Sequence, residues 1–214
     1  MNESIPYKYC LRRVSKNNLD KKLKNCKSFK TLSLKHVLDE FRTSQEEISI
    51  FLTNDITKTD EIGILFCLSS LNVLKDFVYL VIEKTAINRR KIHIQIHEID
   101  MPLQDCGIVH GNFCDLVFGD IDKILSIYKD IFLNKHNYAV IVKKDELIVK
   151  LNAANADGRI IFKYINSELL NSIMNNPSCS ENLKENCEKE IDDRAEEYRS
   201  FFELDFSHPD SDRI

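Results

Sequence analysis

The residues best suited to chemistry in this sequence are histidines and cysteines between positions 93 and 115. They include a Cys-x3-His-x3-Cys arrangement, and the full set is His93, His97, Cys106, His110 and Cys114. Imidazole and thiolate are preferred zinc ligands, although structural zinc sites usually use closer pairs such as Cys-x2-Cys. A thiolate within reach of an imidazole would also act as a nucleophile. One hypothesis is therefore a cysteine- or metal-dependent enzyme centred on residues 93–115.

The pattern around these residues argues against that chemistry. Isoleucines alternate with histidine and glutamine over residues 91–99, which predicts a strand with His93 and His97 on the same face. The two histidines would then lie about 13 Å apart at ~3.3 Å per residue, too far to share one ion. Cys106 and Cys114 carry no family signature of a nucleophilic cysteine. We therefore expect that none of these residues binds a metal or acts in catalysis, and that the protein is not an enzyme.

The glycine content argues against a nucleotide cofactor. A backbone cradle for phosphate needs glycine, because only a residue without Cβ lets successive amides crowd an anion at a helix start. The chain has five glycines, and no two of them are spaced for such a loop. We expect no cofactor.

Length and composition predict one intracellular domain with charged ends. The chain has 214 residues, of which 43% are hydrophobic, enough for one core. The apolar stretch 62–82 contains Lys75 and Asp76, so we expect no membrane span. The first eleven residues lack the apolar core of a secretory signal. Seven irregularly spaced cysteines are typical of reduced thiols, which favours a soluble intracellular protein.

The two ends of the chain carry opposite charges. Residues 1–36 hold ten lysines and arginines against two acidic residues, whereas residues 175–214 hold five against twelve. We expect residues 1–30 to form a flexible basic arm that is either simply solvated, paired with the acidic end, or bound to nucleic-acid phosphates. The candidate nucleic-acid contacts are Arg12, Arg13, Lys16, Lys21, Lys22 and Lys24.

Hydrophobic periodicity predicts an α+β domain over residues 31–177. Strands are expected at residues 48–53, 62–68, 91–99, 113–118, 138–142, 147–151 and 160–165, and helices at 33–41, 70–82, 121–132 and 167–174. The helix and strand assignments of 62–68 and 70–82 are interchangeable. Strands that lead into a helix, followed by three strands and another helix, suit a mainly antiparallel sheet with helices packed on one face.

A charged amphipathic helix is expected over residues 178–202, starting near Ser180, with a disordered tail at 203–214. Its narrow apolar stripe would pack either on its own domain or on another protein. The candidate partner-binding residues are Leu183, Cys187, Ile191, Tyr198, Phe201, Phe202 and Leu204. The stretch from Phe201 to Leu204 resembles the aromatic-x-x-aliphatic core of autophagy-receptor peptides. It is also similar to acidic-aromatic peptides that dock on basic clefts of transcription and replication factors.

These features together predict a non-catalytic protein–protein interaction subunit, a scaffold or adaptor that binds a larger protein in an intracellular complex. A nuclear, DNA-associated complex is the more specific hypothesis, because the basic arm would be drawn to DNA or RNA. Two alternatives belong to other classes. One is an accessory protein that binds nucleic acid directly through the arm, and the other is the enzyme centred on residues 93–115.

Overall fold

The computed structural model describes residues 6–14, 48–97, 99–114, 123, 126–127 and 139–205, with side chains described as far as residue 200. The predicted helix at 33–41 and most of the one at 121–132 lie outside these ranges. Within them, no helix has the length and apolar character needed to cross a membrane.

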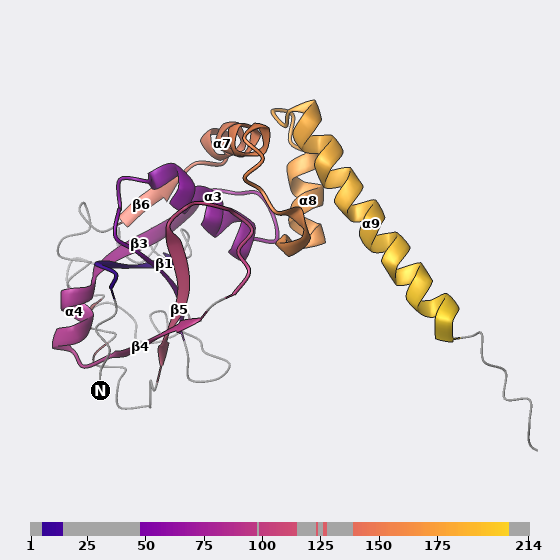
Figure 1. Ribbon diagram of the computed structural model, residues 1–214. Helices are drawn as coiled ribbons and strands as arrows, with labels where there is room; N and C mark the ends of the chain where they lie inside the picture. Colours follow the sequence, from indigo (N-terminus) through magenta and orange to yellow (C-terminus); the bar gives the residue numbers. More distant parts are fainter. Residues whose placement is uncertain are drawn as a thin grey trace, which may run out of the picture.

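One six-stranded sheet organises the fold, and each of its strand pairs is antiparallel (Figure 1). The strands follow the spatial order β4-β5-β2-β1-β3-β6, so β1 and β2 lie at the centre and β4 and β6 at the edges. Their bounds are Tyr9–Val14 for β1, Ile48–Thr53 for β2, Phe77–Glu83 for β3, His93–His97 for β4, Ile108–Cys114 for β5 and Ala139–Val142 for β6.

The described helices complete the α+β fold that the sequence predicts. They are α3 (Thr59–Ser70), α4 (Lys84–Arg89), α7 (Lys144–Ala156), the short 3-10 helix η3 (Phe162–Tyr164), α8 (Ser167–Met174) and α9 (Glu181–Asp205). The predicted charged C-terminal helix is thus present as α9. Its first turn is capped by Ser180, whose hydroxyl oxygen accepts a hydrogen bond from the backbone N–H of Leu183 at 3.3 Å.

Apolar side chains form a core on each face of the sheet. Successive residues of a strand point to opposite faces, so Leu11 of β1 joins a core with α3, α7, α8 and α9, while Cys10 joins a second core on the other face. Ile87 of α4 packs into that second core. Most of the helical mass therefore lies on one face, and α4 lies on the other.

Two neighbouring elements have the opposite secondary structure to the one predicted. Residues 62–68 belong to α3, and residues 77–83 form β3 instead of a helix. Every residue from 62 to 68 is buried, so α3 shows no polar face that would reveal a helical period. Six of the seven residues of β3 are buried because the strand is covered on both faces. Without a polar face, neither segment displays the period of its true structure.

The predicted strands at 147–151 and 160–165 are wrong. The first lies within α7, where Leu147, Ile148 and Leu151 occupy one buried helical face. Lys144, which lies between the strands predicted at 138–142 and 147–151, is the first residue of this helix, and its backbone N–H donates to the Asp76 side chain at 2.9 Å. The second is an isolated bridge at Ile160 followed by η3.

The predicted boundaries of the basic arm and of the C-terminal helix also need correction. Residues 9–14 of the expected flexible arm form β1, which pairs with both β2 and β3. The helix expected at 178–202 extends to Asp205, so the first three residues of the expected tail are helical.

Candidate functional site

The first half of α9 is built into the domain. Leu183 and Cys187 are fully buried in the core that α7 and α8 share, and the half-buried Ile191 packs against the same core. These three candidate partner-binding residues were expected to pack either on their own domain or on another protein. They belong instead to an intramolecular interface, which fixes where the helix starts and the direction it takes.

Asparagines on α7 and α9 set this direction. The Asn155 amide donates to the side-chain oxygen of Asn182, and its own oxygen accepts from the Asn186 amide at 2.9 Å. Asn152 accepts from the backbone N–H of Ser180 at 3.0 Å. Because Asn155 is buried, these hydrogen bonds replace water that its amide would otherwise need. This network was not predicted from the sequence, where its signal is the spacing of Asn152 with Asn155 and of Asn182 with Asn186.

Arg194 is the last described residue of α9 that hydrogen-bonds to the domain. Its guanidinium donates to the Ser167 hydroxyl at 2.9 Å and to the backbone oxygens of Phe162 and Lys163 at 3.1 and 3.2 Å. It also pairs with Glu190 of the preceding turn at 2.8 Å. One side chain thereby fastens α9 to both η3 and α8. This role of Arg194 was not predicted from the sequence.

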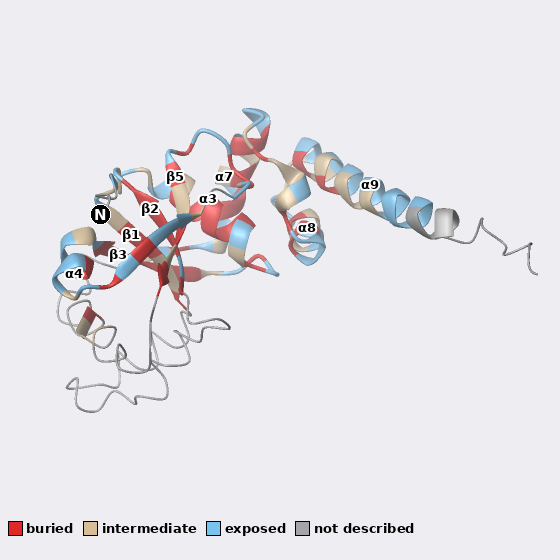
Figure 2. Cartoon of the chain, turned by 60° about the horizontal axis from the view of Figure 1, so that its bottom comes forward, coloured by how far each residue is buried: buried red, intermediate tan, exposed pale blue. Residues whose placement is uncertain are grey.

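Beyond Arg194 the helix leaves the domain. We call residues 195–205 the projecting segment. Figure 1 shows this end of α9 extending away from the sheet, and Figure 2 colours residues 195–200 as exposed. The side chain of Tyr198 is 71% exposed. The predicted partner residues Phe201, Phe202 and Leu204 lie in this segment, beyond residue 200, the last residue whose side chain the structure describes.

The predicted nucleic-acid contacts fall into two groups. Arg12 and Arg13 are half-buried residues of the central strand β1, where Arg12 donates through Nη1 to the backbone oxygen of Ser49 at 2.6 Å. Lys16, Lys21, Lys22 and Lys24 lie outside the described residues. The two arginines are thus part of the sheet, not of a flexible arm.

Four of the five candidate metal or nucleophile residues lie on one face of the sheet, as two separate pairs. The register of β4 and β5 places His93 opposite Cys114 and His97 opposite His110, whose ring centroids are 5.9 Å apart. Cys106 is separate, with its thiol 3.7 Å from the backbone oxygen of Leu103. Among the residues that the structure describes, no three histidine, cysteine, aspartate or glutamate side chains are placed to hold a metal ion.

One polar partner of His110 is a serine to which the sequence pattern assigned no role. The Oγ atom of Ser49 on β2 is 2.8 Å from Nε2 of His110 on β5. Both residues point to the face of the sheet that carries the larger core, and both line a pocket beside the end of α3. Ser49 alternates with Ile48 and Ile50 in the sequence, so its face was predictable but its neighbour was not.

Burial controls the protonation of several thiols. Burial raises the pKa values of Cys10, Cys67 and Cys187 to about 12. Burial and the nearby Asp60 carboxylate raise the pKa of Tyr79 to about 12 as well. These three thiols remain protonated at neutral pH, which makes them weak nucleophiles.

Comparison with known proteins identifies no relative: no family model, no curated protein and no solved structure matches this chain.

Proposed function

We propose that this protein is a non-catalytic subunit that joins a larger protein through the projecting segment of α9. The observation that carries the proposal is the continuation of α9 for about three turns past Arg194, the last anchor described. Short helices are marginal in water, and most of their stability in proteins comes from packing. A partner surface would provide that packing for residues 195–205.

The composition of the projecting segment defines the partner's chemistry. Four acidic residues and one arginine surround Tyr198, and aromatic residues follow it three and four positions later, the spacing of one helical face. An amphipathic helix of this kind fits a hydrophobic groove. We therefore propose a groove that is apolar along its floor and carries lysine or arginine at its rim, so that the charges are complementary.

The proposed location is inside the cell. The six described cysteines are free thiols, which supports a reducing compartment. The ten basic residues among residues 1–36 support the finer proposal of a nuclear, DNA-associated complex.

Affinity purification tests the proposal with three tagged proteins: the full chain, Tyr198→Ala and a variant ending at Arg194. We expect the full chain to retain a partner that both variants lose. With that partner purified, Tyr198→Ala should weaken binding about 30-fold, the effect of losing ~2 kcal/mol from an aromatic anchor. The affinity of the full chain should also fall as salt is raised.

Val149→Ala is the matched control. Val149 is 61% exposed on α7, so this variant also removes an exposed apolar side chain, but far from the projecting segment in sequence. It should bind like the full chain. Equal retention of the same partner by the variant ending at Arg194 would contradict the proposal.

Direct contact with nucleic acid is a second proposal, supported by the position of Arg13 near the end of β1, where the chain enters its lysine-rich stretch. It needs a test that keeps β1 intact. Lys16, Lys21, Lys22 and Lys24 are changed together to glutamate, and binding to a labelled DNA duplex is followed by fluorescence anisotropy. We expect the affinity to drop and its salt dependence to become shallower. Unchanged affinity would exclude these lysines as the contact.

A further inference from the structure

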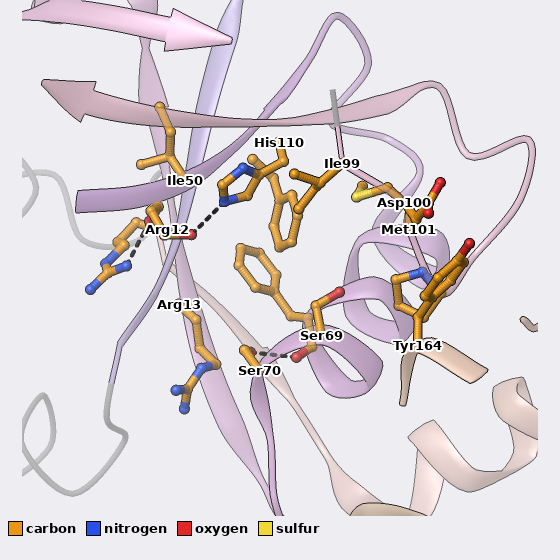
Figure 3. A pocket seen from close by; sticks show the side chains of 14 residues that line it. Arg12, Arg13, Ile50, Ser69, Ser70, Ile99, Asp100, Met101, His110 and Tyr164 are labelled. Atoms are coloured by element: carbon orange, nitrogen blue, oxygen red, sulfur yellow. Dashed lines mark hydrogen bonds between the residues drawn. The ribbon is translucent and has the colours of Figure 1, made fainter. Parts of the chain in front are cut away.

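A pocket of about 370 Å³ opens on the face of the sheet that carries the larger core (Figure 3). Strands β1, β2 and β5, the last turn of α3, the loop at 99–102 and η3 all contribute side chains to it. Its volume is within the range of about 300–1,000 Å³ that is usual for small-molecule sites. Segments that are far apart in the sequence thus converge on one cavity.

Aromatic rings form part of its lining. Phe51 of β2 and Phe66 of α3 meet edge to face with ring centroids 5.0 Å apart. The His110 ring meets Phe51 in the same manner at 5.8 Å. Edge-to-face clusters of this kind favour a further aromatic ring, since ring edges and faces attract one another. The apolar part of the pocket therefore suits a planar aromatic group.

The two arginines of the pocket lie at one of its ends. Figure 3 shows Arg12 and Arg13 at this end, and Asp100 and Tyr164 at the other. Ser49 lies beside Arg12, whose Nη1 donates to its backbone oxygen at 2.6 Å, and its hydroxyl is 2.8 Å from Nε2 of His110. A hydroxyl both donates and accepts, so Ser49 has capacity for a ligand atom in addition to His110. A guanidinium is the side-chain group whose geometry best matches a carboxylate.

We propose that this pocket binds a small aromatic carboxylate. The ring lies against Phe51 and Phe66, and the carboxylate lies toward Arg13 and the Ser49 hydroxyl. Asp100 disfavours the reverse orientation, because it would bring two carboxylates together. The site is independent of the projecting segment of α9, so it adds a ligand to the proposed docking function.

Phenylacetate is the probe that tests the proposal, with 2-phenylethanol as its uncharged counterpart and acetate as its counterpart without a ring. Each is titrated into the isotope-labelled full chain, and amide shifts are followed by NMR. We expect phenylacetate to shift the amides of Ser49, Phe51 and Phe66 with a dissociation constant of about 1 mM or tighter. The two counterparts should bind at least tenfold more weakly.

Two variants locate the site. Arg13→Gln keeps most of the side-chain stem and removes the charge. This variant should bind phenylacetate at least tenfold more weakly, and its affinity for 2-phenylethanol should not change. Ser69→Leu places a larger, apolar side chain at the pocket from an exposed position on α3. This variant should bind neither phenylacetate nor 2-phenylethanol. Ser200→Leu, an equivalent change at an exposed position of α9, should leave binding intact.

The amide spectrum of each variant also reports whether it is folded, so a loss of binding is interpreted only with native dispersion. Absence of shifts with phenylacetate in the unaltered chain would overturn the proposal. Equal binding of 2-phenylethanol and phenylacetate, or unchanged phenylacetate binding by folded Ser69→Leu, would overturn it as well.

Discussion

At the scale of single residues, Gly111 of β5 lies where neighbouring strands leave no space for a side chain. A Cβ atom at this position would lie 2.8 Å from the backbone oxygen of Gln95 on β4, and 3.1 Å from a methyl group of Leu52. The backbone oxygen belongs to a paired strand and has little freedom to move. Glycine is therefore required here by space.

We predict that Gly111→Ala lowers the free energy of unfolding by about 1–3 kcal/mol, the usual effect of overpacking. Gly63→Ala is the matched control, because its Cβ would make ordinary contacts of 3.6 and 3.7 Å with Val142. Removing a glycine from α3 should stabilise it by up to about 1 kcal/mol. Urea denaturation of both variants measures the difference, and equal stability of the two would contradict the role of Gly111.

The buried thiol of Cys67 predicts a specific loss of stability at alkaline pH. Burial raises its pKa from 9.0 to about 12 in the folded protein. Above pH 9 the unfolded chain releases this proton while the folded chain retains it, so the contribution is complete below pH 9 and is lost as the pH rises toward 12. The expected slope is about 1.4 kcal/mol per pH unit for one thiol.

Urea denaturation under reducing conditions at several pH values checks this prediction. Cys67→Ala should lose less stability than the unaltered chain above pH 9, by approximately that slope. If the two stability curves run parallel from pH 8 to pH 10.5, the Cys67 thiol does not titrate as described.

At the scale of elements, the sequence predicts a strand best where one face is polar. The alternation over residues 91–99 places His93 and His97 on one face, as β4 confirms. Where a segment is buried on all sides, as in the middle of α3 and in β3, the alternation of polar and apolar residues disappears. The predicted strand is then a helix and the predicted helix is a strand. The pairing of Ser49 with His110 depends on the register between β2 and β5, which the local sequence does not encode.

Arg194 divides α9 into an anchored part and the projecting segment. Arg194→Gln removes the hydrogen bonds to Ser167, Phe162 and Lys163. We expect hydrogen exchange to accelerate throughout residues 188–200, with a loss of about 1–3 kcal/mol in the stability of that region.

Arg199→Gln is the control, since Arg199 is exposed in the projecting segment and should change stability by less than about 0.5 kcal/mol. Exchange followed by mass spectrometry compares the two variants. Identical exchange profiles would mean that Arg194 does not anchor the helix.

At the scale of the whole molecule, the domain includes α9 as far as its anchor. The predicted boundary at residue 177 separates Leu183 and Cys187 from the core they complete. The predicted boundary of the basic arm at residue 30 is wrong for a similar reason, because residues 1–30 include β1 at the centre of the sheet. Sequence composition marked both boundaries, whereas long-range packing decides which residues fold together.

We predict that a variant ending at Arg194 keeps its melting temperature within about 2 °C of the full chain, because the projecting segment contributes little packing to the domain. A variant ending at Pro177 should be destabilised by at least ~4 kcal/mol, the combined effect of uncovering two buried side chains and the surface beneath them. Circular dichroism during heating measures both. Similar melting of the two variants would show that the anchored part of α9 is dispensable.

The position of β6 has a consequence for biosynthesis. β3 pairs with β6 along one of its sides, and β6 is the last strand of the sheet to leave the ribosome. At ~5–20 residues per second, that side of β3 stays open in the nascent chain for about 3–12 s. An open strand edge invites pairing with other chains. During translation, the open side of β3 is therefore where pairing with other chains would compete with completion of the sheet.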